Sequence, residues 1–452
     1  MADDSTTVDW SCLPPELLQT IAKNLPALAD YIRFRAVCHS WQRAAPISQP
    51  YLPREFPWLM LPLDRSSNRR SFSNPLTKNH QSLTLPEASH SRRLAGSSHG
   101  WLVLIDESPP IFLINPLTRD RISLPPLSSF PIVTNFDFYS IGREYTVRSP
   151  ENEIDFFSLK EMRDSFIRKA ILSHSPHDNA DFFAFAILNQ RENLAYCKNG
   201  RDEAWRIIDG VEMLLRSELV ASLSYTAPIP TPDASVSTTN SLEKSGKAKT
   251  GADIIALFNL SKASCASSGQ LNAAPFMHGE DVIYFNGAFY AVDKFGSIAV
   301  CDLNGDSPVV KFINVVQQID GDMKYLVDAM GELLLVARYL EFHIDMQYYM
   351  EVCKTVKFRV FRFDWNGHEW KELANLHDRV LVLGDNSSLA LLASDYRGCR
   401  GNMIYFTDDH SGSNRDSVGG DHDVGVYNLG DGSIHELPCY PCWPSWITPS
   451  LC

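Results

Sequence analysis

The stretch "EDVIYFNGAFYAVDKFGSIAVCDLNGD", residues 280–306, determines how the larger part of the chain folds. Two short apolar runs, rich in β-branched and aromatic residues, flank Asn286-Gly287, and this dipeptide between such runs is a strong hairpin signal. A second turn at Phe295-Gly296 leads into a third apolar run. The stretch therefore predicts short antiparallel strands joined by tight turns.

The same pattern recurs on both sides of this stretch. "GWLVLIDESPPIFLINPLTRDRISLPPL" begins at residue 100, and "NSSLALLASDYRGCRGNMIYFTDD" begins at residue 386. The recurrence of about 40–60 residues is close to the length of a four-stranded propeller blade. Such units close into a β-propeller, whereas one sandwich of about 100 residues would not account for so long a segment. We therefore predict an all-β, kelch-like β-propeller of about six to seven blades over residues 97–449.

Two segments do not follow this pattern. Residues 226–251, "TAPIPTPDASVSTTNSLEKSGKAKTG", are polar and rich in Pro, Ser and Thr, which predicts a flexible surface insertion. Residues 48–96 are rich in Pro, Ser and Arg and show little core-forming pattern, so we expect a connector there.

The segment 9–47 has a helical pattern instead. Pro14 and Pro15 stand at an expected helix start, where a missing backbone N–H costs nothing. "ELLQTIAKNL" then places apolar residues at helical spacing, and after Pro26 the run "ALADYIRFRAVCHSWQRAA" predicts two further short helices. The whole chain is thus expected to be multidomain α + β, with three small helices before the propeller.

Composition and charge limit the classes of function. Apolar residues make up 44% and charged residues 21%, which is an ordinary globular composition. The net charge is −13, and residues 101–452 carry −16, so we expect no nucleic-acid partner because this surface would repel a phosphate backbone. The acidic, polar start "MADDSTTVDW" is unlike a signal peptide, and no apolar run is long enough to span a membrane. Ten scattered cysteines fit a reducing compartment, so we expect a cytoplasmic and/or nuclear protein without a membrane partner.

"DWSCLPPELLQTIAKNLP" and "DYIRFRAVCHSWQRAA" together resemble the F-box, a three-helix module that docks on the Skp-type adaptor of a cullin–RING ubiquitin ligase. The resemblance covers nearly the whole helical segment, and Tyr31, where the family more often has leucine, is a departure that keeps apolar area. It implies an adaptor-binding set of Leu13, Pro14, Leu17, Ile21, Leu25, Val37, Cys38 and Trp41.

The physical chemistry of this segment agrees with the resemblance. Three short helices have more apolar residues than their own core can use, so a surplus face must be covered by something else. A partner protein is one candidate, and Trp, Leu and Ile are suitable interface residues. The propeller is the other candidate. Arg33 and Arg35 are expected on the solvated side.

The remainder of the chain also resembles a known family. "GWLV", "INPLTRDRISLPPL", "GNMIYFTDD", "DVGVYNLGDGSI" and "WPSWITPSLC" are similar to the KIB-type β-propeller of a large plant F-box family. This resemblance runs over most of residues 60–449 and implies a propeller that recruits a target protein. It does not identify the target.

Chemical motifs are weak. Cys439 and Cys442 form a lone CxxC near His435, without the second ligand pair that zinc needs. The acidic and histidine residues near the two ends of a Gly/Ser-rich loop lack EF-hand spacing, and the loop is expected to be a solvated acidic loop: Asp408, Asp409, His410, Asp421, His422 and Asp423. The tryptophans are expected to pack the blades rather than form a ligand platform: Trp101, Trp205, Trp365, Trp370, Trp443 and Trp446.

These observations predict the substrate-recognition subunit of a Skp–cullin–F-box E3 ubiquitin ligase. The expected partners are the Skp-type adaptor, through it the cullin–RING ligase, and an unidentified target protein. We expect no catalytic residue, cofactor or metal in this chain. Two alternatives stay open: a binding module that does not assemble with the ligase, and a propeller enzyme using copper, which would need Tyr and His ligands converging at the central axis.

Overall fold

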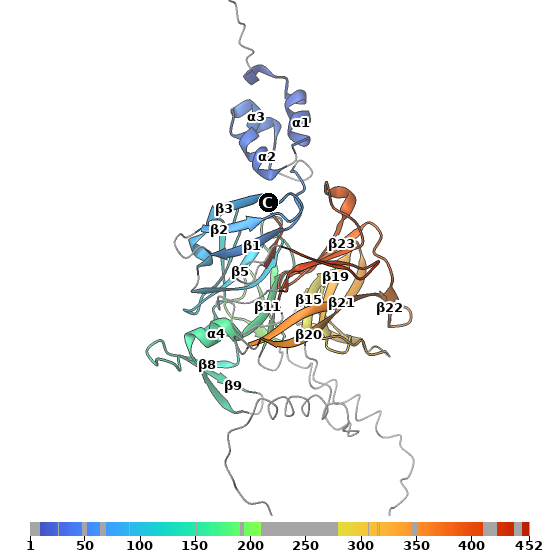
Figure 1. Ribbon diagram of the computed structural model, residues 1–452. Coiled ribbons are helices and arrows are strands. Elements are labelled where there is room, and N and C mark those ends of the chain that lie inside the picture. The colour runs from blue at the N-terminus through green and yellow to red at the C-terminus, as the bar shows by residue number, and fades with distance from the viewer. Residues whose placement is uncertain are drawn as a thin grey trace, which may run out of the picture. The chain divides into compact units, whose positions relative to one another are not determined.

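Three short helices come first in the computed structural model of the chain, and a series of small β-sheets follows them (Figure 1). The structure describes residues 10–25, 27–47, 52–63, 69–89, 91–149, 152–189, 194–208, 279–305, 307–313, 315, 317–345, 350–409, 423–437 and 445–451. The predicted insertion at 226–251 lies outside these described residues.

The helices form a small core of their own. Pro15 occupies the first turn of α1, where its missing N–H is not needed. Leu18, Ala22, Tyr31 and Phe34 are buried between the helices, and the Tyr31 hydroxyl donates to the Pro46 carbonyl oxygen at 2.9 Å. Tyr31 thus fills the position where leucine is more usual and gains a hydrogen-bond partner. The bounds are η1 Trp10–Cys12, α1 Pro15–Lys23, α2 Leu28–Arg35 and α3 His39–Ala44, which confirms the predicted helices.

Four of the four-stranded sheets are antiparallel and have their strands in chain order. In three of them the first hairpin turn has two residues with positive φ, namely His99-Gly100, Asn286-Gly287 and Met330-Gly331, as a two-residue type I′ turn requires. The strands are β4 Arg92–Ser98, β5 Trp101–Asp106, β6 Ile111–Ile114 and β7 Arg121–Leu124; β11 Ile167–Leu172, β12 Phe183–Leu188, β13 Leu194–Lys198 and β14 Arg206–Ile207; β15 Gly279–Phe285, β16 Ala288–Asp293, β17 Ile298–Asp302 and β18 Val309–Ile313; β19 Met323–Ala329, β20 Glu332–Asp345, β21 Met350–Asp364 and β22 Glu369–Leu373.

A further sheet joins the two ends of the chain in the order β28-β1-β2-β3. Its strands are β1 Trp58–Leu63, β2 Arg69–Ser73, β3 His80–Thr84 and β28 Ser445–Ile447. The expectation of a connector over 48–96 is therefore wrong for most of that range, since β1–β4 lie within it or begin in it. Its Pro, Ser and Arg content hid the strands because β2 lacks the alternation of a half-buried strand: Arg69 is exposed, and the two buried residues, Phe72 and Ser73, are adjacent at its end.

Two sheets depart from the regular pattern. The last one has the order β24-β23-β25-β26-β27, and β23 pairs in parallel with β25. The other has only three strands, β10-β9-β8. It lies in the chain between the sheet β4–β7 and the sheet β11–β14, and α4 follows it. The bounds are β23 Arg379–Leu383, β24 Leu389–Leu392, β25 Met403–Phe406, β26 Gly425–Asn428, β27 Ile434–Glu436, β8 Val133–Phe136, β9 Tyr145–Arg148, β10 Ile154–Phe157, α4 Leu159–Ser165, η2 Pro86–Ala88, η3 Leu127–Ser129 and η4 Ala393–Asp395.

The core lies between successive sheets. Strand β6 is buried along its whole length, which is expected when both faces of a sheet are covered. Phe185 of β12 stacks on Phe289 of β16 at 4.5 Å, and Trp446 of β28 donates from Nε1 to the Leu383 carbonyl oxygen at 3.1 Å. Apolar clusters thus join neighbouring sheets along the chain, and another joins the last sheet to the first. The domain is mostly β-sheet and propeller-like.

Candidate functional site

The helix α1 has two apolar faces. Leu18 and Ala22, four residues apart, face the helical core and are 1% and 3% exposed. Leu17 and Ile21 have the same spacing one residue earlier, yet they are 52% and 42% exposed. The core of the segment is therefore complete without Leu17 and Ile21. Their face is the surplus apolar surface that the sequence predicts.

The other predicted adaptor-binding residues divide by burial. Pro14 is exposed, and Val37, just after α2, is 57% exposed. Leu13, Leu25 and Trp41 are partly buried and pack against the helical core. Cys38 is partly exposed, at the N-terminus of α3.

Trp41 has a structural role within the segment. Its ring centroid lies 4.4 Å from that of Phe34, and its Nε1 donates to the Trp10 carbonyl oxygen at 3.1 Å. Only part of the indole is therefore available to a partner. A substitution of Trp41 would disturb the helical core as well as the surface.

The two arginines do not share one environment. Arg33 is exposed and pairs with Asp30 at 2.9 Å, as expected. Arg35 instead donates from Nη1 to the Gln42 carbonyl oxygen at 3.2 Å and to the Ala45 carbonyl oxygen, so it ties α2 to the end of α3. The expectation that Arg35 is solvated is wrong, because its guanidinium supplies donors to carbonyl groups that the short helix α3 leaves unpaired. Ile32, 43% exposed on α2, is a surface residue that the predicted set omitted.

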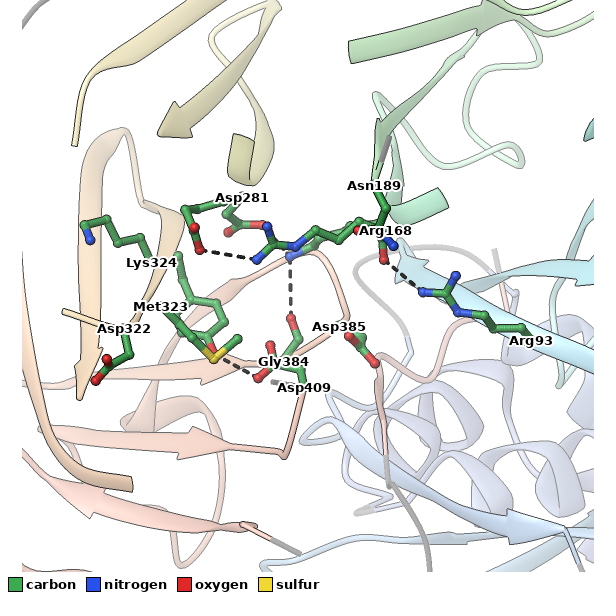
Figure 2. A pocket seen from close by; sticks show the side chains of 13 residues that line it. Arg93, Arg168, Asn189, Asp281, Asp322, Met323, Lys324, Gly384, Asp385 and Asp409 are labelled. Atoms are coloured by element: carbon green, nitrogen blue, oxygen red, sulfur yellow. Dashed lines mark hydrogen bonds and ion pairs between the residues drawn. The ribbon is translucent and has the colours of Figure 1, made fainter. Parts of the chain in front are cut away.

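A second candidate site is a cavity of about 300 Å³ among the first strands of several sheets. Figure 2 shows charged side chains converging there, with Asp281, Arg168, Asp385 and Asp409 near its centre and Lys324 at one side. Lys169 Nζ and Asp281 Oδ1 are 2.5 Å apart, and both side chains are buried. The other oxygen of Asp281 accepts from the Leu326 N–H at 2.8 Å.

Arg338 extends this polar network into the next two sheets. Its guanidinium contacts Asp409 Oδ1 at 2.9 Å and Asp423 Oδ2 at 2.8 Å, and it also donates to the Tyr325 hydroxyl at 3.0 Å. Burial raises the pKa of Asp409 to about 6, although the Arg338 charge acts in the opposite direction. The cations and carboxylates of this network therefore compensate one another within the protein.

This arrangement corrects one expectation from the sequence. Asp408, Asp409 and Asp423 were expected in a solvated acidic loop, but all three are buried. The counter-charge Arg338 lies 71 and 85 residues away from Asp409 and Asp423 in the chain, so no local pattern could indicate it. His410, Asp421 and His422 lie outside the described residues.

The remaining chemical candidates do not form a site in the described part of the chain. Within those residues no group of three or more His, Cys, Asp or Glu side chains is arranged to hold a metal ion. His435 lies exposed on β27, and Cys439 and Cys442 fall outside the description. Among the helices that the structure describes, none has the length and apolarity to cross a membrane.

The tryptophans mostly pack between strands, as predicted. Trp101, Trp205, Trp370 and Trp446 are 3% exposed or less. Trp365 differs, since it is 43% exposed, although its ring centroid lies 4.8 Å from that of Phe363 in a T-shaped arrangement. Trp443 lies outside the described residues.

Comparison with known proteins agrees with this architecture. Residues 70–226 and 250–428 match the family described as KIB1-4 beta-propeller, and residues 10–52 match the family described as F-box-like. The interruption at 227–249 falls within the segment 226–251. The matching propeller is of the KIB type, and nothing in the match is kelch-like.

Individual relatives match over nearly the full chain. F-box protein SKIP23 of Arabidopsis thaliana is 26% identical over 98% of this chain and 96% of its own length. F-box protein At2g17036 of the same plant is 23% identical over 98% and 96%. The solved β-propeller domain of Cps50 (Swd1) from Myceliophteria thermophila covers 84% of this chain and 85% of its own at 10% identity, with a TM-score of 0.32, too low to carry weight. Because the first family match spans well over half of the sequence, this chain belongs to the KIB1-4 beta-propeller family and has an F-box-like segment before its propeller.

Proposed function

We propose that this chain is the substrate-recognition subunit of a Skp–cullin–F-box E3 ubiquitin ligase. The second apolar face of α1, formed by Leu17 and Ile21, is the observation that carries the proposal, because nothing in the helical core needs it. The F-box-like match over the same helices supports it, as do relatives named as F-box proteins. The propeller recruits a target protein, and the assembly acts in the cytoplasm or nucleus.

In this role the chain performs no bond-making step. It raises the effective concentration of the target near the conjugating enzyme, as any linker of two binding events does. The family matches that support this role are the F-box-like and the propeller families.

The adaptor-binding surface has a direct part and a supporting part in this proposal. Pro14, Leu17, Ile21 and Val37 contact the Skp-type adaptor directly, because they are exposed and apolar. The remaining members hold those four in place and add their exposed edges: Leu13, Leu25, Cys38 and Trp41.

We further propose that the propeller has six blades. The sheets of four or five strands each serve as one blade, and β28 completes the first blade from the C-terminal side. The three-stranded sheet β10-β9-β8 is then an addition between two blades. This count falls within the six to seven that the sequence predicts.

The adaptor interaction is tested by co-expression with a Skp-type adaptor and affinity purification. We expect wild-type protein to retain the adaptor, and a Leu17→Ser, Ile21→Ser double variant to lose most of it. These positions are chosen instead of Trp41 because they can change without disturbing the core. A Met330→Ser variant is the matched control, since Met330 is 53% exposed on a turn of the propeller. If wild-type protein retains no adaptor, the chain is a binding module outside the ligase; if the double variant binds as well as wild type, the contact face is wrong.

A further inference from the structure

The small sheet β10-β9-β8 has an open edge at β10. This strand pairs with β9 on one side, and no strand of the described residues pairs with its other side. In Figure 1 the strands β8 and β9 lie at the margin of the propeller close to α4. An open edge strand presents backbone N–H and C=O groups that can pair with a further strand.

The register of the sheet determines which backbone groups lie at this edge. Arg148 of β9 is opposite Ile154 of β10, and its N–H donates away from β10, to the Ile132 carbonyl oxygen at 2.8 Å. In an antiparallel pair, two opposite residues either exchange hydrogen bonds or both direct their groups away, and the two kinds alternate along the strands. Ile154 therefore directs its N–H and C=O groups to the open edge, and Phe156, two residues on, does the same.

The side chains of β10 also distinguish it from the other sheet edges in the described part of the propeller. On those edges, large exposed apolar side chains occur singly, as Val309 on β18 and Leu392 on β24. Ile154 and Phe156 are 56% and 53% exposed, and they face the same side of the sheet because they are two residues apart. Proteins normally avoid apolar edges of this kind because other chains pair with them. The edge at β10 therefore indicates a site for an extended segment.

The two faces of β10 carry opposite charges. On the face of Ile154 and Phe156, the guanidinium carbon of Arg143 lies 5.5 Å from the Phe156 ring centroid, and Arg148 stands opposite Ile154. Both arginines are exposed, and neither forms an ion pair with a residue in the described ranges. On the other face, Asp155 is exposed. An added strand places its residues alternately on the two faces, so it matches this edge with acidic residues on one side and basic residues on the other.

Arg143 is held in place by its own loop. Its N–H donates to the Ser140 carbonyl oxygen at 2.8 Å, and the Ser140 hydroxyl donates to the Asp137 carboxylate at 2.7 Å. The Glu144 carboxylate accepts from the Gly142 N–H at 2.9 Å. The positive charge over β10 is therefore carried by a folded loop. A preformed site loses little conformational entropy when it binds a partner.

A second copy of the chain does not suit this edge. Two β10 edges related by a twofold axis pair antiparallel. Centred on Asp155, this pairing puts the two Asp155 carboxylates opposite each other, and centred on Ile154 it puts Asp155 opposite Glu153. Centred on Phe156, it brings together the two Arg143 guanidinium groups that lie near that ring. Like charges placed opposite each other destabilise a strand pair, so the occupant is a different chain.

We infer that β10 is a strand-addition site for a partner protein. An extended segment of the partner pairs with the open edge, with acidic or apolar residues on the side of Phe156 and Lys or Arg on the side of Asp155. Backbone hydrogen bonds provide the affinity, and the two faces provide the selectivity. The inference rests on the proposed function in one respect, which is that this partner is the ubiquitination target.

The test begins with the immobilised full chain and a random peptide library displayed on phage. We expect enriched peptides to be rich in β-branched residues and to carry an acidic residue next to a Lys or Arg, because neighbouring residues lie on opposite faces of a strand. Enrichment of Pro-rich or helix-forming sequences, or of no sequence, would overturn the inference.

Backbone methylation of a synthetic consensus peptide tests the strand pairing itself. Only every second N–H of an added strand points at β10. N-methylation at one position should therefore weaken binding at least about tenfold, whereas methylation of the neighbouring residue, the matched control, should leave the affinity nearly unchanged. An equal loss of affinity at both positions contradicts strand addition.

Three variants of the chain locate the peptide on β10. Ile154→Pro removes an N–H that β9 does not use, Phe156→Ser removes apolar area, and Arg143→Glu reverses the charge over the ring. Each should bind the consensus peptide at least about tenfold more weakly than wild type. Val309→Ser is the matched control, since Val309 is 50% exposed on another edge strand, β18, and this variant should bind as wild type does. Binding equal to wild type by Phe156→Ser and Arg143→Glu would overturn the inference.

Adaptor retention is measured on the same preparations, and circular dichroism verifies that the variants are folded. If wild-type protein binds the peptide and retains no adaptor, the ligase role is refuted and the strand-addition site stands. If it retains the adaptor and binds no peptide, the strand-addition site is refuted and the ligase role stands. The two proposals therefore fail separately.

Discussion

Replacing Arg338 by methionine should be one of the most destabilising single changes in the propeller. The arginine side chain is 1% exposed, and the two carboxylates that it contacts, on Asp409 and Asp423, are only 6% and 9% exposed. Methionine keeps most of the apolar stem and loses the guanidinium, whose central carbon lies 4.9 Å from the Phe406 ring centroid. It removes the positive charge and leaves both carboxylates buried without it.

The magnitude follows from these contacts. Breaking a buried ion pair by removing one partner costs about 3–5 kcal/mol of unfolding free energy. Asp409 can escape part of this cost by taking up a proton, because its pKa is already about 6. At pH 7 such protonation costs about 1.4 kcal/mol for each pH unit above the pKa. Asp423 also accepts from the Thr355 N–H at 2.8 Å, so it keeps one donor. We therefore expect a loss of about 3–5 kcal/mol rather than the sum of two broken pairs.

The assay is urea unfolding of the full chain, followed by tryptophan fluorescence and circular dichroism. Coincident transitions by the two probes are needed before a free energy is extracted. Arg362→Met is the matched control, because Arg362 pairs with Glu332 at 3.0 Å while both side chains are well exposed. That surface pair should contribute about 1 kcal/mol or less. If Arg338→Met costs no more than the control, the buried network does not hold the sheets together as described.

Three further changes should have measurable effects. Trp446→Ala should lower the unfolding free energy by about 3–5 kcal/mol in urea, since the side chain is fully buried between the last sheet and the first. Gly96→Ala should reduce the thermal midpoint, because a Cβ there would meet the Ala170 carbonyl oxygen at 2.1 Å and backbone cannot move aside as a side chain can. An Asp409→Asn variant should gain stability relative to wild type as pH rises from about 4 to 6. The raised pKa of Asp409 stabilises folded wild-type protein fully below the ordinary pKa of 3.8, and this stabilisation is lost as pH rises through about 6. Urea unfolding midpoints of the two proteins are measured across this pH range, and a difference between them that does not change with pH would contradict the prediction.

Local sequence patterns predicted the elements that depend on local physics. The helix α1 begins at Pro15, and the hairpin between β15 and β16 turns at Asn286-Gly287, because proline at a helix start and Asn-Gly in a turn act through their own backbone preferences. The apolar face of Leu17 and Ile21 was also predictable. Its exposure is expected because the segment has more apolar residues than the core of three short helices can bury.

Contacts between distant segments could not be predicted in this way. The strands β1–β3 were missed because β1 obtains one of its partners, β28, from the other end of the chain. Asp409 and Asp423 were interpreted as solvated for the same reason, since Arg338 is supplied by a different sheet. A polar residue's burial depends on its partner, and a single sequence does not specify which distant residue that partner is.

The junction between the helices and the propeller shows how these two kinds of information combine. The helix α2 has no side-chain cap of its own at Ala27, a position where Ser, Thr, Asp or Asn is usual. The missing acceptor comes from Glu55, whose carboxylate accepts from the Leu28 N–H at 2.6 Å. Burial raises the pKa of Glu55, and this hydrogen bond opposes the rise. Glu55 precedes β1 by three residues, and β1 pairs with β28, so α2 is held by a non-covalent contact to the segment that leads into the strand paired with β28. In the proposed function this contact matters, because an effective concentration is high only when the connection between two binding surfaces limits their separation.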